Sequence, residues 1–159
     1  MDVNASIEQV AGILVREDFK FSTSDDGRSY RLLFGTAGVF IHFTPWGESS
    51  VTIKVHSPVV QDIDPESPGG AEALNLLNDL NQGHLYVKFR MVGGTLIAEY
   101  DLLGDHLQAA ELRNALITVA AAADNLDDDL ADRLGGKRFD TKLEEWDLEQ
   151  EQDEHPPPE

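Results

Sequence analysis

Five histidines are the side chains of this sequence best suited to acid–base or metal chemistry, because cysteine is absent. No two of them have the helical i, i+4 spacing that places two metal ligands on one face of a helix. The chain also lacks a phosphate-binding loop, a dinucleotide-binding glycine pattern, a nucleophile elbow and an H-E-x-x-H motif. We therefore predict that the protein is not an enzyme and that it has no catalytic residue, bound metal or cofactor. The histidines are His42, His56, His84, His106 and His155.

A catalytic alternative stays open. Glu99 and Asp101 lie in a predicted strand and have the chemistry of general acids and bases, as do the strand histidines. Such a site needs a concave pocket in which two of these groups meet within hydrogen-bond reach and have shifted pKa values. A solvated sheet face without a pocket favours a binding module instead.

The charge of the chain is strongly negative and uneven. Its 159 residues hold 12 Lys and Arg against 30 Asp and Glu, a formal net charge of −18. This charge disfavours nucleic acid and anionic membrane surfaces as partners. Residues 140–159 hold nine acids, one base and three consecutive prolines, which is typical of a solvated tail. We expect a folded domain over residues 1–139 and a flexible acidic tail over 140–159.

The N-terminal residues lack the pattern of a secretory signal, and no run of about 18 apolar residues suggests a membrane span. We therefore expect a cytoplasmic protein.

The elements that must position these residues follow from hydrophobic periodicity. Helical spacing predicts helices over 5–16, where Ser6 and Gln9 resemble a capping box, and over 71–81. A third, long helix begins at Asp105 as its cap and ends at Gly135-Gly136. Alternating runs predict strands, separated by short turns, and residues 57–70 read as a loop. The predicted strands of this meander cover residues 19–23, 29–34, 39–44 and 51–56.

A hairpin over 84–103 is the most informative segment, because Gly93-Gly94 is a two-residue loop signal. Pairing outward from this loop places apolar residues opposite one another on one face. Those pairs are Met91 with Leu96, Phe89 with Ala98, Val87 with Tyr100 and Leu85 with Leu102. The other face pairs Lys88 with Glu99, Tyr86 with Asp101 and Arg90 with Ile97. The whole layout predicts an α+β fold, an antiparallel sheet of meander plus hairpin with five or six strands and three helices.

Alternation also separates the two faces of the predicted sheet. One face is apolar, and the opposite face gathers cations and histidines, including His84. We predict that this second face binds acidic or extended polypeptide, with affinity rising as the histidines charge near pH 6.5. An open sheet face is also commonly polar without any ligand, and that interpretation stays open. The predicted peptide-binding residues are Lys20, Arg31, His42, Lys54, His56, Lys88 and Arg90.

The segment from Leu80-Asn81-Gln82-Gly83 through the hairpin to Gly135-Gly136-Lys137-Arg138-Phe139, with its alanine-rich helix at 120–124, resembles the YbjN family, particularly its actinobacterial members. The resemblance covers about residues 1–139. It implies a type III secretion chaperone-like (CesT-like) fold, and a small acidic protein, often a homodimer, that holds peptide or partly folded protein. It carries no catalytic motif.

We therefore predict a non-catalytic, chaperone-like module whose partner is a polypeptide and which forms a homodimer. A regulatory or structural partner of one dedicated protein is the alternative. Leu143, Trp146 and Leu148 stand among the acids of the tail, and an aromatic ring gains free energy on burial. They predict that the tail docks on the body of the protein, with its acids near the sheet face that gathers cations and histidines. A disordered tail, or one that packs on the helices of the same domain, would account for these three residues equally well.

Overall fold

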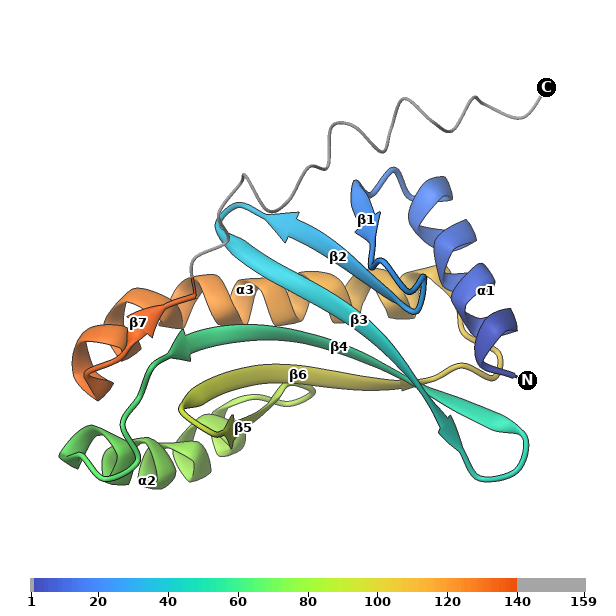
Figure 1. Cartoon of the computed structure of the whole chain (residues 1–159). Helices are drawn as coiled ribbons and strands as arrows, with labels where there is room; N and C mark the ends of the chain where they lie inside the picture. The colour runs from blue at the N-terminus through green and yellow to red at the C-terminus, as the bar shows by residue number, and fades with distance from the viewer. Residues whose placement is uncertain (1, 140–159) are drawn as a thin grey trace.

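The computed structural model describes residues 2–139, which form a seven-stranded sheet with three helices. Figure 1 shows α3 crossing behind the strands, with α1 and α2 near opposite ends of the sheet. The spatial order is β1-β2-β3-β4-β6-β5, with β7 added beside β4, and every pair is antiparallel. The elements are α1 (Val3–Arg16), β1 (Phe21–Thr23), β2 (Ser29–Phe34), β3 (Ala37–Trp46), β4 (Ser50–Gln61), α2 (Pro68–Gly83), β5 (Lys88–Val92), β6 (Thr95–Leu103), α3 (Ala109–Leu134) and β7 (Lys137–Arg138). The α+β prediction with three helices is thus confirmed.

One hydrophobic core lies between the helices and a single face of the sheet. Val55 of β4 and Leu116 of α3 are fully buried in it. Burial alternates along β4 with the period of two expected for a strand that has one covered face. Each fully buried Leu or Ile contributes roughly 1.5–3 kcal/mol, so this core supplies the main driving force for the fold. We call the other face of the sheet, which carries no helix, the open face.

Helix starts differ from the sequence-based predictions. Asp2, not Ser6, is the N-cap of α1, and its side chain accepts the Ala5 N–H at 2.8 Å. Ser6 lies buried inside the helix. Asp105 does not cap α3, because its carboxylate instead accepts the Ser50 hydroxyl. The cap of α3 is Gln108, in a capping box closed by Glu111.

The sheet has seven strands rather than five or six, because β7, after α3, pairs with the end of β4 where the sequence suggested a loop. The predicted loop begins at Ser57, but β4 runs on to Gln61. Pro58 sits at a register shift, where a residue without an N–H is tolerated. Val59 and Val60 are both fully buried, which holds this end of the strand in the core.

The hairpin register is confirmed only near its loop. Lys88 pairs with Glu99, Phe89 with Ala98, Arg90 with Ile97 and Met91 with Leu96, as predicted. The pairs predicted for residues 85–87 do not form, because β5 begins at Lys88. Residues Tyr100–Leu103 of β6 therefore pair with β4 on one side and have no strand of residues 2–139 on the other.

The helices of residues 2–139 include none with the length and apolar character needed to cross a bilayer.

Candidate functional site

An ion-pair cluster lies on the open face, over β4, β6 and the edge strand β5. Glu99 of β6 is only 2 % exposed and contacts three cations. Its carboxylate lies 2.8 Å from Arg90 Nε, 3.2 Å from Lys54 Nζ and 3.4 Å from Lys88 Nζ. Asp101, two residues along the same strand, also pairs with Lys54, at 2.7 Å, and with Lys88. The five side chains come from β4, β5 and β6, which the topology places side by side.

The pairing sets the protonation of both carboxylates. Burial acts to raise the pKa of Glu99, but hydrogen bonds from Arg90 and Lys54 outweigh it and the pKa is lowered. The pKa of Asp101 is lowered by the same balance, with Lys54 and Lys88 as donors. The hydrogen bond to Asp101 raises the pKa of Lys88. Their lowered pKa values keep both carboxylates ionised at neutral pH, where they pair with three basic side chains.

An aromatic ladder lies beside this cluster. The rings of Phe40 and His56, which face each other across β3 and β4, stack at 5.3 Å. His42 also stacks on His56, with ring centroids 5.0 Å apart, and Phe139 meets Phe40 edge-on at 6.2 Å. Burial, with a smaller contribution from the charge of His42, lowers the pKa of His56 to about 4. Burial also lowers the pKa of His42. The expectation that these histidines charge near pH 6.5 is wrong.

The structure brings most of the predicted peptide-binding residues together, but not all. Residues of the open face include Arg31, which pairs with Phe40 across β2 and β3. Lys20 precedes β1 and belongs to no strand. His84 is also off the sheet, because it caps α2 and its ring packs on the core residue Phe89. The predicted residues that do share the open face are Arg31, His42, Lys54, His56, Lys88 and Arg90.

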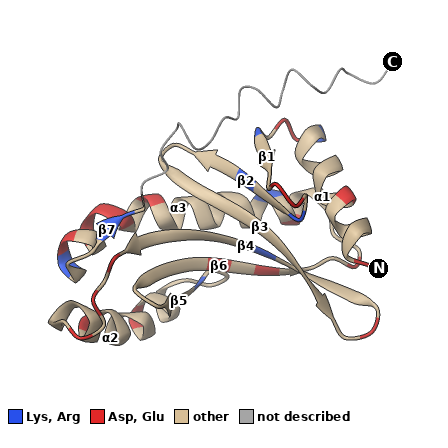
Figure 2. Cartoon of the chain, in the orientation of Figure 1, with Lys and Arg blue, Asp and Glu red and all other residues tan. Residues whose placement is uncertain are grey.

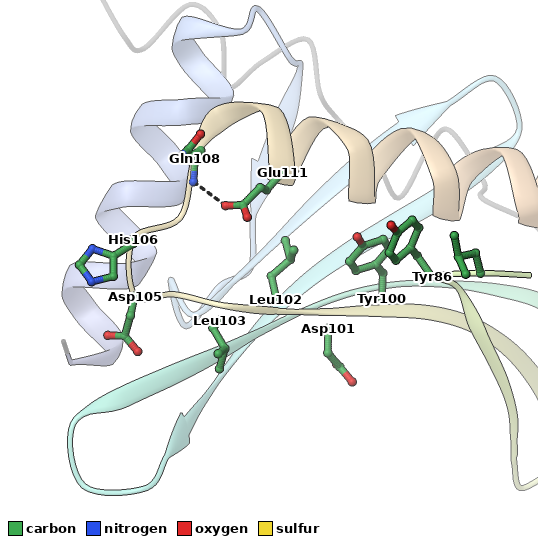
Figure 3. A pocket seen from close by; sticks show the side chains of 10 residues that line it. Tyr86, Tyr100, Asp101, Leu102, Leu103, Asp105, His106, Gln108 and Glu111 are labelled. Carbon is green, nitrogen blue, oxygen red and sulfur yellow. Dashed lines mark hydrogen bonds between the residues drawn. The ribbon is translucent and has the colours of Figure 1, made fainter.

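A pocket of about 670 Å³ opens where β6 runs past the end of β5 (Figure 3). Tyr86 and Tyr100 stack at one end of it, with centroids 5.8 Å apart. The start of α3 and the turn before it form the other end (Figure 3). Its lining is Leu85, Tyr86, Tyr100, Asp101, Leu102, Leu103, Asp105, His106, Gln108 and Glu111.

Sequence reasoning missed this pocket, because it paired residues 85–87 with β6. A signal was present in the run Leu85-Tyr86-Val87, which is apolar without interruption and so fits no half-exposed strand. Leu85 is in fact 86 % exposed and Tyr86 is 61 % exposed, while Val87 is buried.

The comparisons with known proteins bear on what these surfaces do. Residues 4–142 match the family model TY-Chap1, described as T3SS (YopN, CesT) and YbjN peptide-binding chaperone 1. The chain belongs to the TY-Chap1 family. The match covers more than half of the sequence, and it confirms the resemblance to YbjN and to type III secretion chaperones. An actinobacterial subtype is not shown by it.

The fold agrees with that assignment. The chain is similar to the crystal structure of YbjN from E. coli, described there as a proposed transcription regulator, with a TM-score of 0.55 at 13 % identity. The alignment covers 85 % of this chain and 96 % of the other. The comparison with curated proteins gave no match.

As a TY-Chap1 protein, the chain is a peptide-binding, chaperone-like module, and the partner class is polypeptide. Neither the family nor the site geometry indicates catalysis. Glu99 is enclosed by cations rather than open to a substrate, and it does not line the pocket. Within residues 2–139 no three His, Asp or Glu side chains are placed to hold a metal ion.

Proposed function

We propose that the chain holds an extended polypeptide along the unpaired edge of β6, with side chains of the ligand in the adjoining pocket. The observation that carries this proposal is the position of Tyr100–Leu103. These four residues extend beyond the β5 ladder and border a pocket of about 670 Å³. The family match supplies the ligand class, because TY-Chap1 proteins bind peptides.

The backbone of this edge has the chemistry for strand addition. Tyr100–Leu103 is held in extended form by its register with Thr52 to Val55 of β4. Its other side is unpaired within residues 2–139, so backbone N–H and C=O groups there can form hydrogen bonds with an added ligand strand. Hydrogen bonds to a ligand backbone give affinity without sequence dependence, and side-chain pockets then give selectivity.

Exposed apolar side chains surround the edge. Leu85, Tyr86 and Leu103 all line the pocket, and Leu103 is 57 % exposed. A cluster of large exposed apolar residues beside an open strand edge marks an interaction surface rather than ordinary solvent exposure. The stacked rings of Tyr86 and Tyr100 give the pocket a rigid apolar wall with hydroxyl groups for hydrogen bonding.

Charge defines the preferred ligand further. Asp105 and Glu111 line the pocket beside Asp101, whose carboxylate already pairs with Lys54 and Lys88, and the chain as a whole has a formal charge of −18. A segment that alternates apolar with basic residues would fit the edge and gain from this charge. The same charge disfavours DNA, so regulation through direct DNA contact is not supported.

A binding assay with matched peptides tests the proposal. The probe is a short fluorescent peptide that alternates valine with lysine, compared with a valine–glutamate peptide and with a proline-containing version that cannot pair as a strand. Tyr86→Ser and Leu103→Ser should each weaken the valine–lysine peptide several-fold. Val15→Ser and Ile117→Ser, at exposed apolar positions on α1 and α3, should leave binding unchanged.

Equal effects of all four substitutions, or equal binding of the proline-containing peptide, would overturn the edge site. Co-purification from the native cell then distinguishes the two polypeptide functions. Many bound proteins indicate a general chaperone, whereas one stoichiometric protein indicates a dedicated regulatory or structural partner.

We also propose that two copies associate. Exposed Leu74 supports an interface on α2, outside the lining of the pocket. Light scattering of the full chain checks the mass, and Leu74→Ser should shift it toward the monomer. A dimer lost instead on Leu103→Ser would mean that a second copy, and not a client, occupies the β6 edge.

A further inference from the structure

The backbone after α3 turns sharply and leads the chain to the open face. Gly135 terminates the helix in the left-handed region at φ 68°, which glycine adopts without strain. Gly136 then passes so close to β4 that an added Cβ would lie 2.6 Å from both the Gln61 carbonyl oxygen and Val60 Cγ1. Only a glycine permits this approach, after which β7 pairs with β4.

Two residues, Arg138 and Phe139, hold this segment in place. Arg138 pairs with Asp128 at 3.2 Å and with Asp127 at 3.8 Å, which ties β7 back to α3. Phe139 places its ring against Phe40 of the aromatic ladder, and its N–H donates to the Val59 carbonyl at 3.5 Å. The described part of the chain therefore ends in contact with the open face.

We propose that residues 140–159 dock on the open face of their own chain, with Trp146 extending the aromatic ladder and the acids facing the cations. Leu143, Trp146 and Leu148, which the sequence marks as docking residues, lie outside the described residues. The inference concerns the open face and does not depend on the peptide site proposed at the β6 edge.

The reach of the segment fits the face. Trp146 follows Phe139 by seven residues, a length that spans at most about 23 Å when extended. The distance from β3 to β5 across β4 and β6 is three strand spacings, about 14 Å. The ring of Trp146 can therefore reach any strand between Phe40 and the ion-pair cluster.

Charge complementarity favours this occupant. Within residues 2–139 the open face carries four cations, Arg31, Lys54, Lys88 and Arg90, against the two carboxylates of Glu99 and Asp101, so it keeps a local surplus of two positive charges after the cluster has paired. Figure 2 shows Lys and Arg on these strands, with acidic residues on β6 between them. Arg31 has no ion pair with any of residues 2–139, so it is available to an acid of the segment. The segment brings nine acids and one base.

The ladder supplies a matching apolar surface. His56 is neutral at pH 7, since its pKa lies near 4, so Phe40 and His56 together present uncharged stacked rings. An indole ring gains by covering such a surface, because aromatic pairs add contact energy to the burial of area.

Quenching of Trp146 fluorescence in the full chain tests the proposal. The chain has two tryptophans, so Trp46→Phe leaves Trp146 as the single probe. Docking predicts that acrylamide quenches Trp146 several-fold less than in the same chain unfolded in urea, and independently of protein concentration. Phe40→Ser should restore quenching to the unfolded level, while Ile117→Ser on α3 should not change it.

His42→Ala, at an exposed position of the ladder, gives a milder second variant in case Phe40→Ser unfolds the domain, which circular dichroism would reveal. Quenching equal to that of the unfolded chain would overturn the proposal. So would protection that survives both ladder substitutions, because the segment would then pack elsewhere. Protection that disappears on dilution would also overturn it, by placing the segment on a second copy. None of these readouts depends on peptide binding at the β6 edge.

Discussion

Arg90 Nε and Glu99 Oε2 meet across the β5–β6 hairpin at 2.8 Å, on the face of the sheet that carries no helix. The carboxylate is almost fully buried although its strand face is open, because Lys54 and Lys88 cover it from both neighbouring strands. Burial of an ionised carboxylate is tolerated only where such partners compensate its charge. The hairpin register therefore brings the charges of the cluster together, and the cluster in turn stabilises that register.

Glu99→Gln should destabilise the domain. Removal of the buried charge leaves three cations without their common partner, and breaking a buried ion pair costs about 3–5 kcal/mol. Because the cations are partly exposed and water can solvate them, we expect about 2 kcal/mol here. Urea unfolding at pH 7 measures it. Asp101→Asn is the matched control and should cost less, since Asp101 is more exposed than Glu99. Equal costs would contradict the central position of Glu99.

Stability should fall as the pH decreases from about 6.5 to about 4. The folded chain keeps His56 neutral until about pH 4, whereas the unfolded chain takes up that proton near 6.5. The unfolded state then binds more protons, which costs the folded state up to roughly 3 kcal/mol. Burial dominates this shift, with repulsion from His42, Lys54 and Arg90 opposed by Glu99.

His56→Gln should reduce the slope in this window, where His42, whose pKa is also lowered by burial, still contributes. The two carboxylates, with lowered pKa values in the folded chain, add to the loss only from about pH 4.5 downward, where the unfolded chain begins to protonate them. Unfolding in urea at several pH values measures the profile. NMR titration of the His56 ring gives an independent check, and a midpoint near 6.5 would rule the explanation out.

Gly136→Ala should disturb the passage from α3 to β7. The added methyl group would lie 2.6 Å from backbone and side-chain atoms of β4, and overpacking of this kind costs about 1–3 kcal/mol. Gly83→Ala is the control, since nothing lies within 4 Å of its Cβ position. Hydrogen exchange should show faster exchange of the Phe139 amide in Gly136→Ala and not in Gly83→Ala. Unchanged protection of that amide would refute the close approach.

Ser6→Ala should be neutral or stabilise the chain by up to about 1 kcal/mol, because the buried Ser6 hydroxyl has no hydrogen-bond partner within residues 2–139. Asp2→Ala should instead cost about 1 kcal/mol through loss of the N-cap of α1. Thermal unfolding distinguishes the two. A larger loss of stability for Ser6→Ala than for Asp2→Ala would instead support the capping box that the sequence suggests at Ser6.

Where side chains alternate cleanly, the sequence was sufficient to predict both faces of the sheet. The pairs Lys88–Glu99 and Arg90–Ile97 followed from counting outward from Gly93-Gly94, and the structure has them. The open face of cations and histidines followed from the same period of two. Neither required knowledge of distant contacts, because hairpin pairing is local in sequence.

The pocket was not predictable in this way. Counting outward cannot reveal where pairing stops, and the departure of residues 85–87 from β6 depends on how the preceding helix joins the sheet. The side-chain amide of Asn81 near the end of α2 bonds both the N–H and the C=O of Phe89 and so anchors the start of β5. That contact joins a helix to a strand and leaves no periodic trace in the sequence.

The sequence by itself determined the fold class, the membership of strands in faces and the strong negative charge, because local periodicity and composition control these properties. Only the tertiary structure decided that Glu99 neutralises the cations around it, that His56 stays uncharged and that Phe139 lies against the open face. The physical reason is that ion pairing, burial and stacking depend on distances between strands, and those distances exist only once the sheet has formed.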